Sequence, residues 1–149
     1  MTAIAALQFA SVPLPSDIAC YNFSSTDIPS GVAVMIDGTN VMGTAGDGPG
    51  VANVSGTPYA IGVTMEIIKA AGTSGSPTAG PGRVRTQGIA PMTANGSITA
   101  GGVVDASTTS LKIGFAVAHV TGHPQLGVAM STAVDAEPVL VLIQPANNA

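Results

Sequence analysis

A short apolar motif that occurs twice places the strongest constraint on how this chain can fold. Ile61-Gly62-Val63-Thr64-Met65 is matched by Leu126-Gly127-Val128-Ala129-Met130, and a proline shortly precedes each copy. A glycine inside a short apolar run is typical of a β-strand that bulges, or that approaches a neighbouring backbone closely, at that position. We therefore predict two core strands in which Gly62 and Gly127 are equivalent structural glycines.

Further short apolar runs, separated by turn signals, continue this pattern. Asp37-Gly38 lies between the runs 31–36 and 39–42. It predicts a two-residue hairpin in which Val34 faces Val41. One face then carries Val32, Val34, Ile36 and Val41, and the other carries Met35 and Met42. Asn95-Gly96 predicts another tight turn. Pro138 to Ile143 is a continuous apolar run typical of a strand buried on both faces.

The remaining runs complete an all-β prediction. Strands are also expected at 51–54, 83–87, 88–92 and 111–120, and residues 97–105 are expected to be a glycine turn that leads into a strand. The segments 43–50 and 70–82 are rich in glycine or in glycine, serine and proline and are expected to be loops. No stretch shows the periodicity of a helix. Six to nine short strands with regular turns are typical of a small β-barrel or β-sandwich.

The first 28 residues differ from the rest. Pro13-Leu14-Pro15 imposes extended backbone on its neighbours, so we predict an extended N-terminal arm over residues 1–28 and a single β domain over residues 29–149. Apolar side chains cost roughly 25 cal/mol for each Å² left in water. The arm is therefore expected to lie on its own barrel, on a sister subunit or on a larger partner through Ile4, Leu7, Phe9, Val12 and Leu14.

Charge is scarce and slightly acidic, which limits the classes of partner. Charged residues make up 8% of the chain and the net charge is −4, whereas soluble proteins contain about 25% charged residues. Four basic residues in total cannot form a phosphate-binding patch, so no nucleic-acid binding is expected. Weak electrostatic self-repulsion favours association, and we expect a homo-oligomer.

We also expect no targeting or membrane-spanning segment. Met1 to Ala10 is apolar but has no basic residue ahead of it and is interrupted by Gln8, so we do not expect a signal peptide. No apolar run approaches the roughly 20 residues of a membrane span. The single cysteine, Cys20, is expected to be a small buried hydrophobe in a protein made in a reducing compartment.

No group of residues predicts catalysis or a cofactor. His119 and His123 have the spacing of two zinc ligands on a helix, but Thr121-Gly122 and Pro124 prevent a helix there, and a third ligand is missing. They are predicted to be polar loop histidines. The glycines of residues 43–50 precede neither a Gly-Lys-Ser/Thr sequence nor a helix that could hold a phosphate. We expect no metal, no cofactor and no enzymatic activity.

Two other residue classes have structural interpretations. The carboxylates that could form an acid/base pair are predicted to be solvated turn residues, because neither burial nor a charged neighbour can be inferred for them. These are Asp37, Asp47, Asp105, Asp135 and Glu137. The methionines are predicted to fill gaps in a core that is short of aromatic residues. These are Met35, Met42, Met65, Met92 and Met130.

The order of these segments points to one family. The series consists of the early hairpin, Tyr59 to Val63, Gly82 to Gly88, Ile98 to Val104, Gln125 to Met130 and Glu137 to Ile143. Over about residues 30 to 145 this series resembles the head decoration (cement) proteins of tailed bacteriophages. The ordered series carries the resemblance, and no single motif in it is specific.

The resemblance implies a structural role. Such proteins are small β-barrels or sandwiches, tulip-like or jelly-roll, that bind the outer surface of a capsid, usually as trimers, and clamp neighbouring coat subunits. It implies the major capsid protein as partner, the virion surface as location after synthesis in the host cytoplasm, and the five apolar arm residues as a capsid or subunit interface. The alternative is a carbohydrate-binding or receptor-binding β module on a virion, which needs clustered exposed rings. The five aromatic residues are scattered along the chain.

Overall fold

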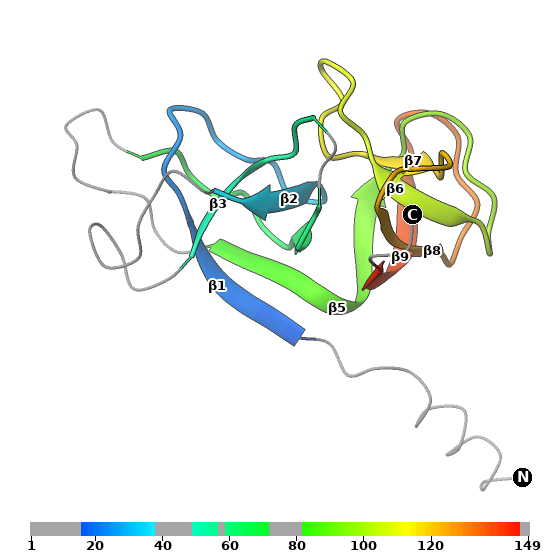
Figure 1. Cartoon of the computed structure of the whole chain (residues 1–149), viewed down its shortest axis with the longest axis horizontal. Helices are drawn as coiled ribbons and strands as arrows, with labels where there is room; N and C mark the ends of the chain where they lie inside the picture. The colour runs from blue at the N-terminus through cyan, green and yellow to red at the C-terminus, as the bar shows by residue number, and fades with distance from the viewer. Residues whose placement is uncertain (1–15, 38–48, 57–58, 72–81, 147–149) are drawn as a thin grey trace, which may run out of the picture.

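The computed structural model describes residues 16–37, 49–56, 59–71 and 82–146, and the described chain is all-β, as predicted (Figure 1). None of these residues belongs to a helix that is long and apolar enough to cross a membrane. The described strands are β1 (Ser16–Asn22), β2 (Ala33–Ile36), β3 (Gly50–Asn53), β4 (Gly62–Thr64), β5 (Gly82–Thr93), β6 (Val103–Ala106), β7 (Ala116–Ala118), β8 (Gln125–Ala129) and β9 (Pro138–Ala146).

The first five strands form a closed barrel. Their order is β1-β3-β2-β4-β5, and β1 also pairs with β5, which closes the ring. β1 and β3 are parallel, whereas the other neighbours are antiparallel. The interior is filled mainly by β-branched side chains, which suit a pleated and buried surface. These are Ile28, Val32, Val34, Val51, Ile68 and Val84, together with Cys20.

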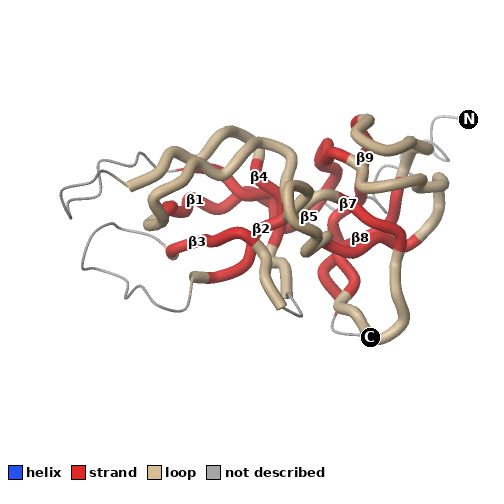
Figure 2. Tube along the Cα trace, turned by 90° about the horizontal axis from the view of Figure 1, so that it is seen from above, coloured by secondary structure: helices blue, strands red, loops and turns tan. Residues whose placement is uncertain are grey.

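The second half of the chain forms a further sheet, which we call the C-terminal sheet. Its order is β5-β9-β8-β6-β7. A β-bridge between Ala94, just after β5, and Ala116 of β7 brings the two ends of this order together. Its inner face packs Met92, Val104, Leu126, Val141 and Ile143 into one core. Figure 2 shows the barrel strands and the C-terminal sheet side by side, with β5 between them.

β5 is common to both sheets and turns sharply near its middle (Figure 1). Up to Gln87 it pairs with β1, and from Gly88 onward it pairs with β9. Gly88 has φ of +101°, a backbone conformation that residues with a Cβ atom rarely adopt. The two strands predicted at 83–87 and 88–92 are therefore one strand with a glycine bend.

The predicted hairpin after β2 is wrong in its pairing. Val34 pairs with Asn53 of β3 on one edge and with Gly62 of β4 on the other, so neither edge is left for Val41. Val32 and Val34 do face the barrel interior, and Met35 faces the opposite side. Ile36, at the end of β2, is exposed. Residues 39–42 lie outside the described residues.

The boundary of the predicted arm also differs from the structure. Residues 16–22 form β1, which is a full member of the barrel, and Ile28 is buried and bridges to Ile68. Residues 16–22 and Ile28 therefore belong to the barrel. The proline-containing stretch at residues 1–15 lies outside the described residues, as do 43–48 and 72–81 of the predicted loops.

The predicted strand over residues 111–120 is shorter than expected. Only Ala116–Ala118 form a strand, β7, and turns precede it. Leu111 and Gly114 have φ of +69° and +78°, in the left-handed region, and both lie in the turns that precede β7. The alternating apolar residues misled the prediction, because Leu111 is 95% exposed and does not face a core.

Candidate functional site

The arm residues predicted as an interface, Ile4, Leu7, Phe9, Val12 and Leu14, lie outside the described residues. The structure does show where their segment joins the body. Ser16, the first described residue, is paired with Gln87 of β5. Residues 1–15, which we call the arm from here on, therefore join the body beside the bend at which β5 passes from the barrel to the C-terminal sheet.

Next to this point the C-terminal sheet presents an apolar outer face. Residues paired across antiparallel strands share a face of the sheet. Ile89 of β5 is paired with Leu142 of β9, which is paired with Val128 of β8, which is paired with Val103 of β6. All four side chains point away from the core and are partly exposed, while their neighbours Ala90, Val141, Ile143, Ala129 and Val104 are buried in it.

A second row of the same face is also apolar. Pro91 of β5 is paired with Leu140 of β9, and the Met130 amide donates a hydrogen bond to the Leu140 carbonyl at 2.7 Å. Leu140 is 46% exposed and Met130 is 51% exposed. Met130 was predicted to fill the core and instead lies on the surface, because it follows the last core residue of β8. We call this set the outer sheet face: Ile89, Pro91, Val103, Val128, Met130, Leu140 and Leu142.

Seven neighbouring apolar side chains without a charge among them are unusual for an exposed sheet. Singly scattered apolar residues need no explanation, whereas a contiguous patch is typical of a surface that binds another segment or protein. The outer sheet face can bury apolar area and supplies no acid, base or nucleophile. Its chemistry is that of a docking surface.

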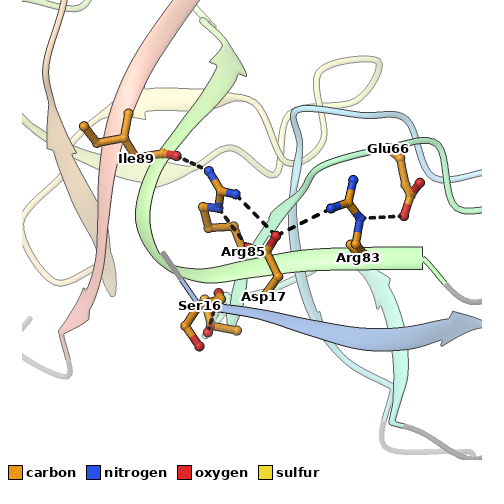
Figure 3. A network of polar contacts seen from close by, with 7 residues as sticks. Ser16, Asp17, Glu66, Arg83, Arg85 and Ile89 are labelled. Atoms are coloured by element: carbon orange, nitrogen blue, oxygen red, sulfur yellow. Dashed lines mark hydrogen bonds and ion pairs between the residues drawn. The ribbon is translucent and has the colours of Figure 1, made fainter. Parts of the chain in front are cut away.

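An ionic network lies beside the β5 bend (Figure 3). The Arg85 guanidinium donates to both carboxylate oxygens of Asp17 in β1, with Nε–Oδ1 at 2.8 Å and Nη2–Oδ2 at 3.3 Å. It also donates to the Ile89 carbonyl at 2.7 Å. Arg83 contacts Glu66 at 3.3 Å from a more exposed position. Arg85 thus links β1 to β5 on both sides of the bend.

The electrostatics of this pair follow from its geometry. The hydrogen bond from Arg85 lowers the pKa of Asp17 below its ordinary value of 3.8, and the same bond raises the pKa of Arg85. Both side chains are about one-fifth exposed. The pair is therefore ionised at neutral pH and holds the bend in place, which is a structural rather than a chemical task.

The two histidines have different environments. His119 Nδ1 lies 2.7 Å from Asp105 Oδ1, and the other Asp105 oxygen accepts a hydrogen bond from the Val120 amide at 2.9 Å. Asp105 is 1% exposed, so its prediction as a solvated turn carboxylate is wrong. The missed signal is its place in β6, between apolar residues. His123 is exposed in a turn, as predicted.

The other candidate residues do not assemble into a reactive site. Asp135 and Glu137 are exposed, and Lys112 lowers the pKa of Asp135. Cys20 is buried, as predicted. Across the described ranges, no group of three or more His, Cys, Asp or Glu side chains is placed to hold a metal ion. A cavity of about 330 Å³ lies beside Val32, Thr93, Leu111 and Phe115, and no titratable side chain lines it.

Aromatic side chains are dispersed in the described part of the chain. Tyr59 is 67% exposed, whereas Tyr21 and Phe23 are partly buried and pack with their ring centroids 6.4 Å apart. Phe115 packs against the barrel core. These rings do not form a flat exposed platform on which a sugar could stack.

Gly62 and Gly127 occupy corresponding positions in β4 and β8. A Cβ atom on Gly62 would collide with the Arg85 carbonyl of β5, and one on Gly127 would collide with the Leu142 carbonyl of β9. β8 has a register irregularity between Gln125 and Gly127, whereas none is found at Gly62. Of the predicted methionines, Met92 is buried and Met35 and Met65 pack against the core, while Met42 lies outside the described residues.

Comparison with solved structures identifies a similar fold. The chain matches no protein-family model and no curated protein sequence. Among solved structures, the N-terminal base of the head fibre protein gp8.5 of bacteriophage phi29 has a similar fold, with a TM-score of 0.60 and 10% sequence identity. The match covers 88% of this chain and 95% of that chain. The two proteins therefore share an all-β fold over nearly their whole lengths.

Proposed function

We propose that this chain is a structural protein of a bacteriophage head, attached to the outer surface of the capsid. The observation that carries the proposal is the similarity of fold to the phi29 head fibre base over nearly the whole of both chains. The outer sheet face and the low charge of the chain support the proposal that it is part of a larger protein assembly. The resemblance of the strand order to head decoration proteins points the same way.

Within this role we favour decoration of the capsid over display of a fibre. The chain would bind the major capsid protein as a homotrimer and bridge neighbouring coat subunits. Binding would rest on apolar burial by the arm residues Ile4, Leu7, Phe9, Val12 and Leu14, and each copy would add about a few kcal/mol, repeated over the shell. No catalysis and no cofactor are part of this proposal.

Removal of residues 1–15 tests the proposal. We expect the shortened chain to keep its β circular dichroism spectrum, because β1 begins at Ser16, and to lose co-sedimentation with expanded capsids of the phage. The full chain and its His123→Ala variant serve as controls that bind. Capsid binding by the shortened chain would contradict the role of the arm, and failure of the full chain to bind would contradict the capsid role itself.

The alternative function, a carbohydrate-binding or receptor-binding module, makes a different prediction. It requires exposed rings that converge on one face, and the described aromatic residues do not converge. Clear binding to a glycan array by the full chain, together with no binding to capsids, would reverse the order of the two proposals.

A further inference from the structure

We propose that residues 1–15 dock on the outer sheet face of their own chain in the free protein. The inference does not depend on the proposed function, because it concerns the isolated protein in solution. The outer sheet face is the surface on which the apolar side chains of the arm can be buried.

The first support is the place and direction in which the arm begins. Ser16 is paired with Gln87, two residues before Ile89, where the outer sheet face starts. β1 runs antiparallel to β5, so the chain followed backward from Ser16 heads in the direction in which β5 enters the C-terminal sheet. Figure 3 shows Ser16 at the start of β1, close to Arg85 and Asp17 at the bend.

The second support is the match in chemistry. Residues 1–15 contain no Asp, Glu, Lys, Arg or His, and they include the five large apolar residues already named. The outer sheet face has the same character, with no charge among its seven side chains. Burial of one against the other removes apolar surface from water on both sides and leaves no buried charge without a partner.

The third support is length. Fifteen residues in extended conformation span up to about 50 Å. Four neighbouring strands measure roughly 15 Å across at a spacing of about 4.8 Å. The segment is therefore long enough to cross β5, β9, β8 and β6 at the outer sheet face. Since the arm is tethered at the edge of this face, its effective concentration there reaches about the millimolar range, which favours its own chain over a second copy.

Paramagnetic NMR on the full chain tests the proposal directly. A spin label is attached at position 6 through Ala6→Cys, while the native Cys20 is protected, since it is buried and burial raises its thiol pKa to about 11. We expect the methyl signals of Val103, Val128, Leu140 and Leu142 to broaden. The methyl signals of Ile36 and Ile67, which are exposed on the barrel, should stay sharp.

A second sample separates the possible occupants of the outer sheet face. In a mixture of isotope-labelled chain without spin label and spin-labelled chain without isotope, broadening of the outer sheet face would assign it to the arm of a second copy and overturn the proposal. Equal broadening over all surface methyl groups, or none, would also overturn it. Neither sample contains a capsid, so failure here leaves the capsid role unaffected.

A surface variant gives the matched control. Leu140→Glu places a charge in the outer sheet face, and Ile36→Glu places one on the barrel at a side chain with the same exposure of 46%. We expect Leu140→Glu to lower the equilibrium constant for docking roughly tenfold, equivalent to about 1.4 kcal/mol, and Ile36→Glu to leave the broadening unchanged. An equal effect of both variants would contradict docking at this face.

Discussion

Arg85 links β1 to both sides of the bend in β5. It binds the Asp17 carboxylate in β1 and the Ile89 carbonyl beyond the bend of β5. Because the pair is only about one-fifth exposed, solvent screens it less than an ordinary surface ion pair. Its loss should therefore weaken both the closure of the barrel and the bend.

We predict that Arg85→Met lowers the free energy of unfolding by about 1 to 2 kcal/mol, since charge-assisted hydrogen bonds are lost and Asp17 is left without its main partner. Urea unfolding followed by circular dichroism measures the change. Arg83→Met is the matched control, because Arg83 is 61% exposed and should contribute less than about 1 kcal/mol. Equal losses for the two variants would show that Arg85 does not act as the link across the bend.

Asp17 also makes a prediction about pH. Its pKa is lower in the folded chain than its ordinary value of 3.8 because Arg85 hydrogen-bonds to the ionised form. Folding therefore favours the deprotonated carboxylate, and this stabilisation is present above the ordinary pKa and is lost as the pH falls through the lowered value. Asp27 and Asp135, paired with Lys69 and Lys112, have pKa shifts in the same direction.

We expect the difference in Tm between the wild-type chain and Asp17→Asn to be largest at about pH 6 and to shrink below about pH 4. Thermal unfolding at a series of pH values measures it. A difference that stays constant down to about pH 2.5 would mean that ionised Asp17 contributes nothing specific to folding.

At the scale of the strands, the two glycine-containing elements pack in the same way. Gly62 of β4 lies directly against a backbone carbonyl of β5, and Gly127 of β8 lies directly against a backbone carbonyl of β9. Neither position has room for a Cβ atom. A branched side chain there must push two backbones apart, and a backbone cannot move aside as a flexible side chain can.

We predict that Gly127→Val lowers the free energy of unfolding by about 3 kcal/mol or more, or prevents folding. His123→Ala, four residues earlier and exposed in a turn, should change it by less than about 0.5 kcal/mol. Chemical denaturation of soluble variants, and the soluble yield of those that do not fold, give the measurement. Gly127→Val with wild-type stability would show that β8 and β9 can separate without cost.

The elements that could be predicted from sequence are those with local signals. The strands around Gly62, Gly127 and Val141 follow from short apolar runs, and the absence of helix among the described residues follows from the lack of a 3.6-residue period. β1 was missed because the prolines before it dominate the pattern. The pairing of β2 was wrong because closure of the barrel joins strands that are distant in sequence, which a local turn signal cannot specify.

The candidate surface was still harder to predict. Leu140 and Leu142 lie in a continuous apolar run, which is typical of a strand buried on both faces, yet both are partly or largely exposed. Only the register of β9 against β5 and β8 shows that alternate residues of this run face outward. Asp105 shows the reverse error, since it is predicted to be solvated and is buried. Its burial depends on the turn after β7, which brings His119 and Val120 over it.

At the scale of the whole molecule, the barrel and the C-terminal sheet are not independent. They share β5, and one core contains Ala33 and Val63 from the barrel strands together with Leu126 and Ile143 from the C-terminal sheet. If β5 separated from either sheet, apolar core residues of both sheets would become exposed to water. This arrangement supports our expectation that the β domain folds as a single unit.

We therefore predict one cooperative unfolding transition at a fixed protein concentration. Val34→Ala in the barrel and Val141→Ala in the C-terminal sheet are a matched pair, since both valines are fully buried in different cores. Each should cost about 2 kcal/mol and lower the single Tm by roughly 4 to 8 °C. Amide hydrogen exchange should show the same loss of protection at slow-exchanging sites in both sheets for either variant, because those sites open only by global unfolding. Two calorimetric transitions, or a loss of protection confined to the mutated sheet, would divide the chain into two folding units joined at Gly88.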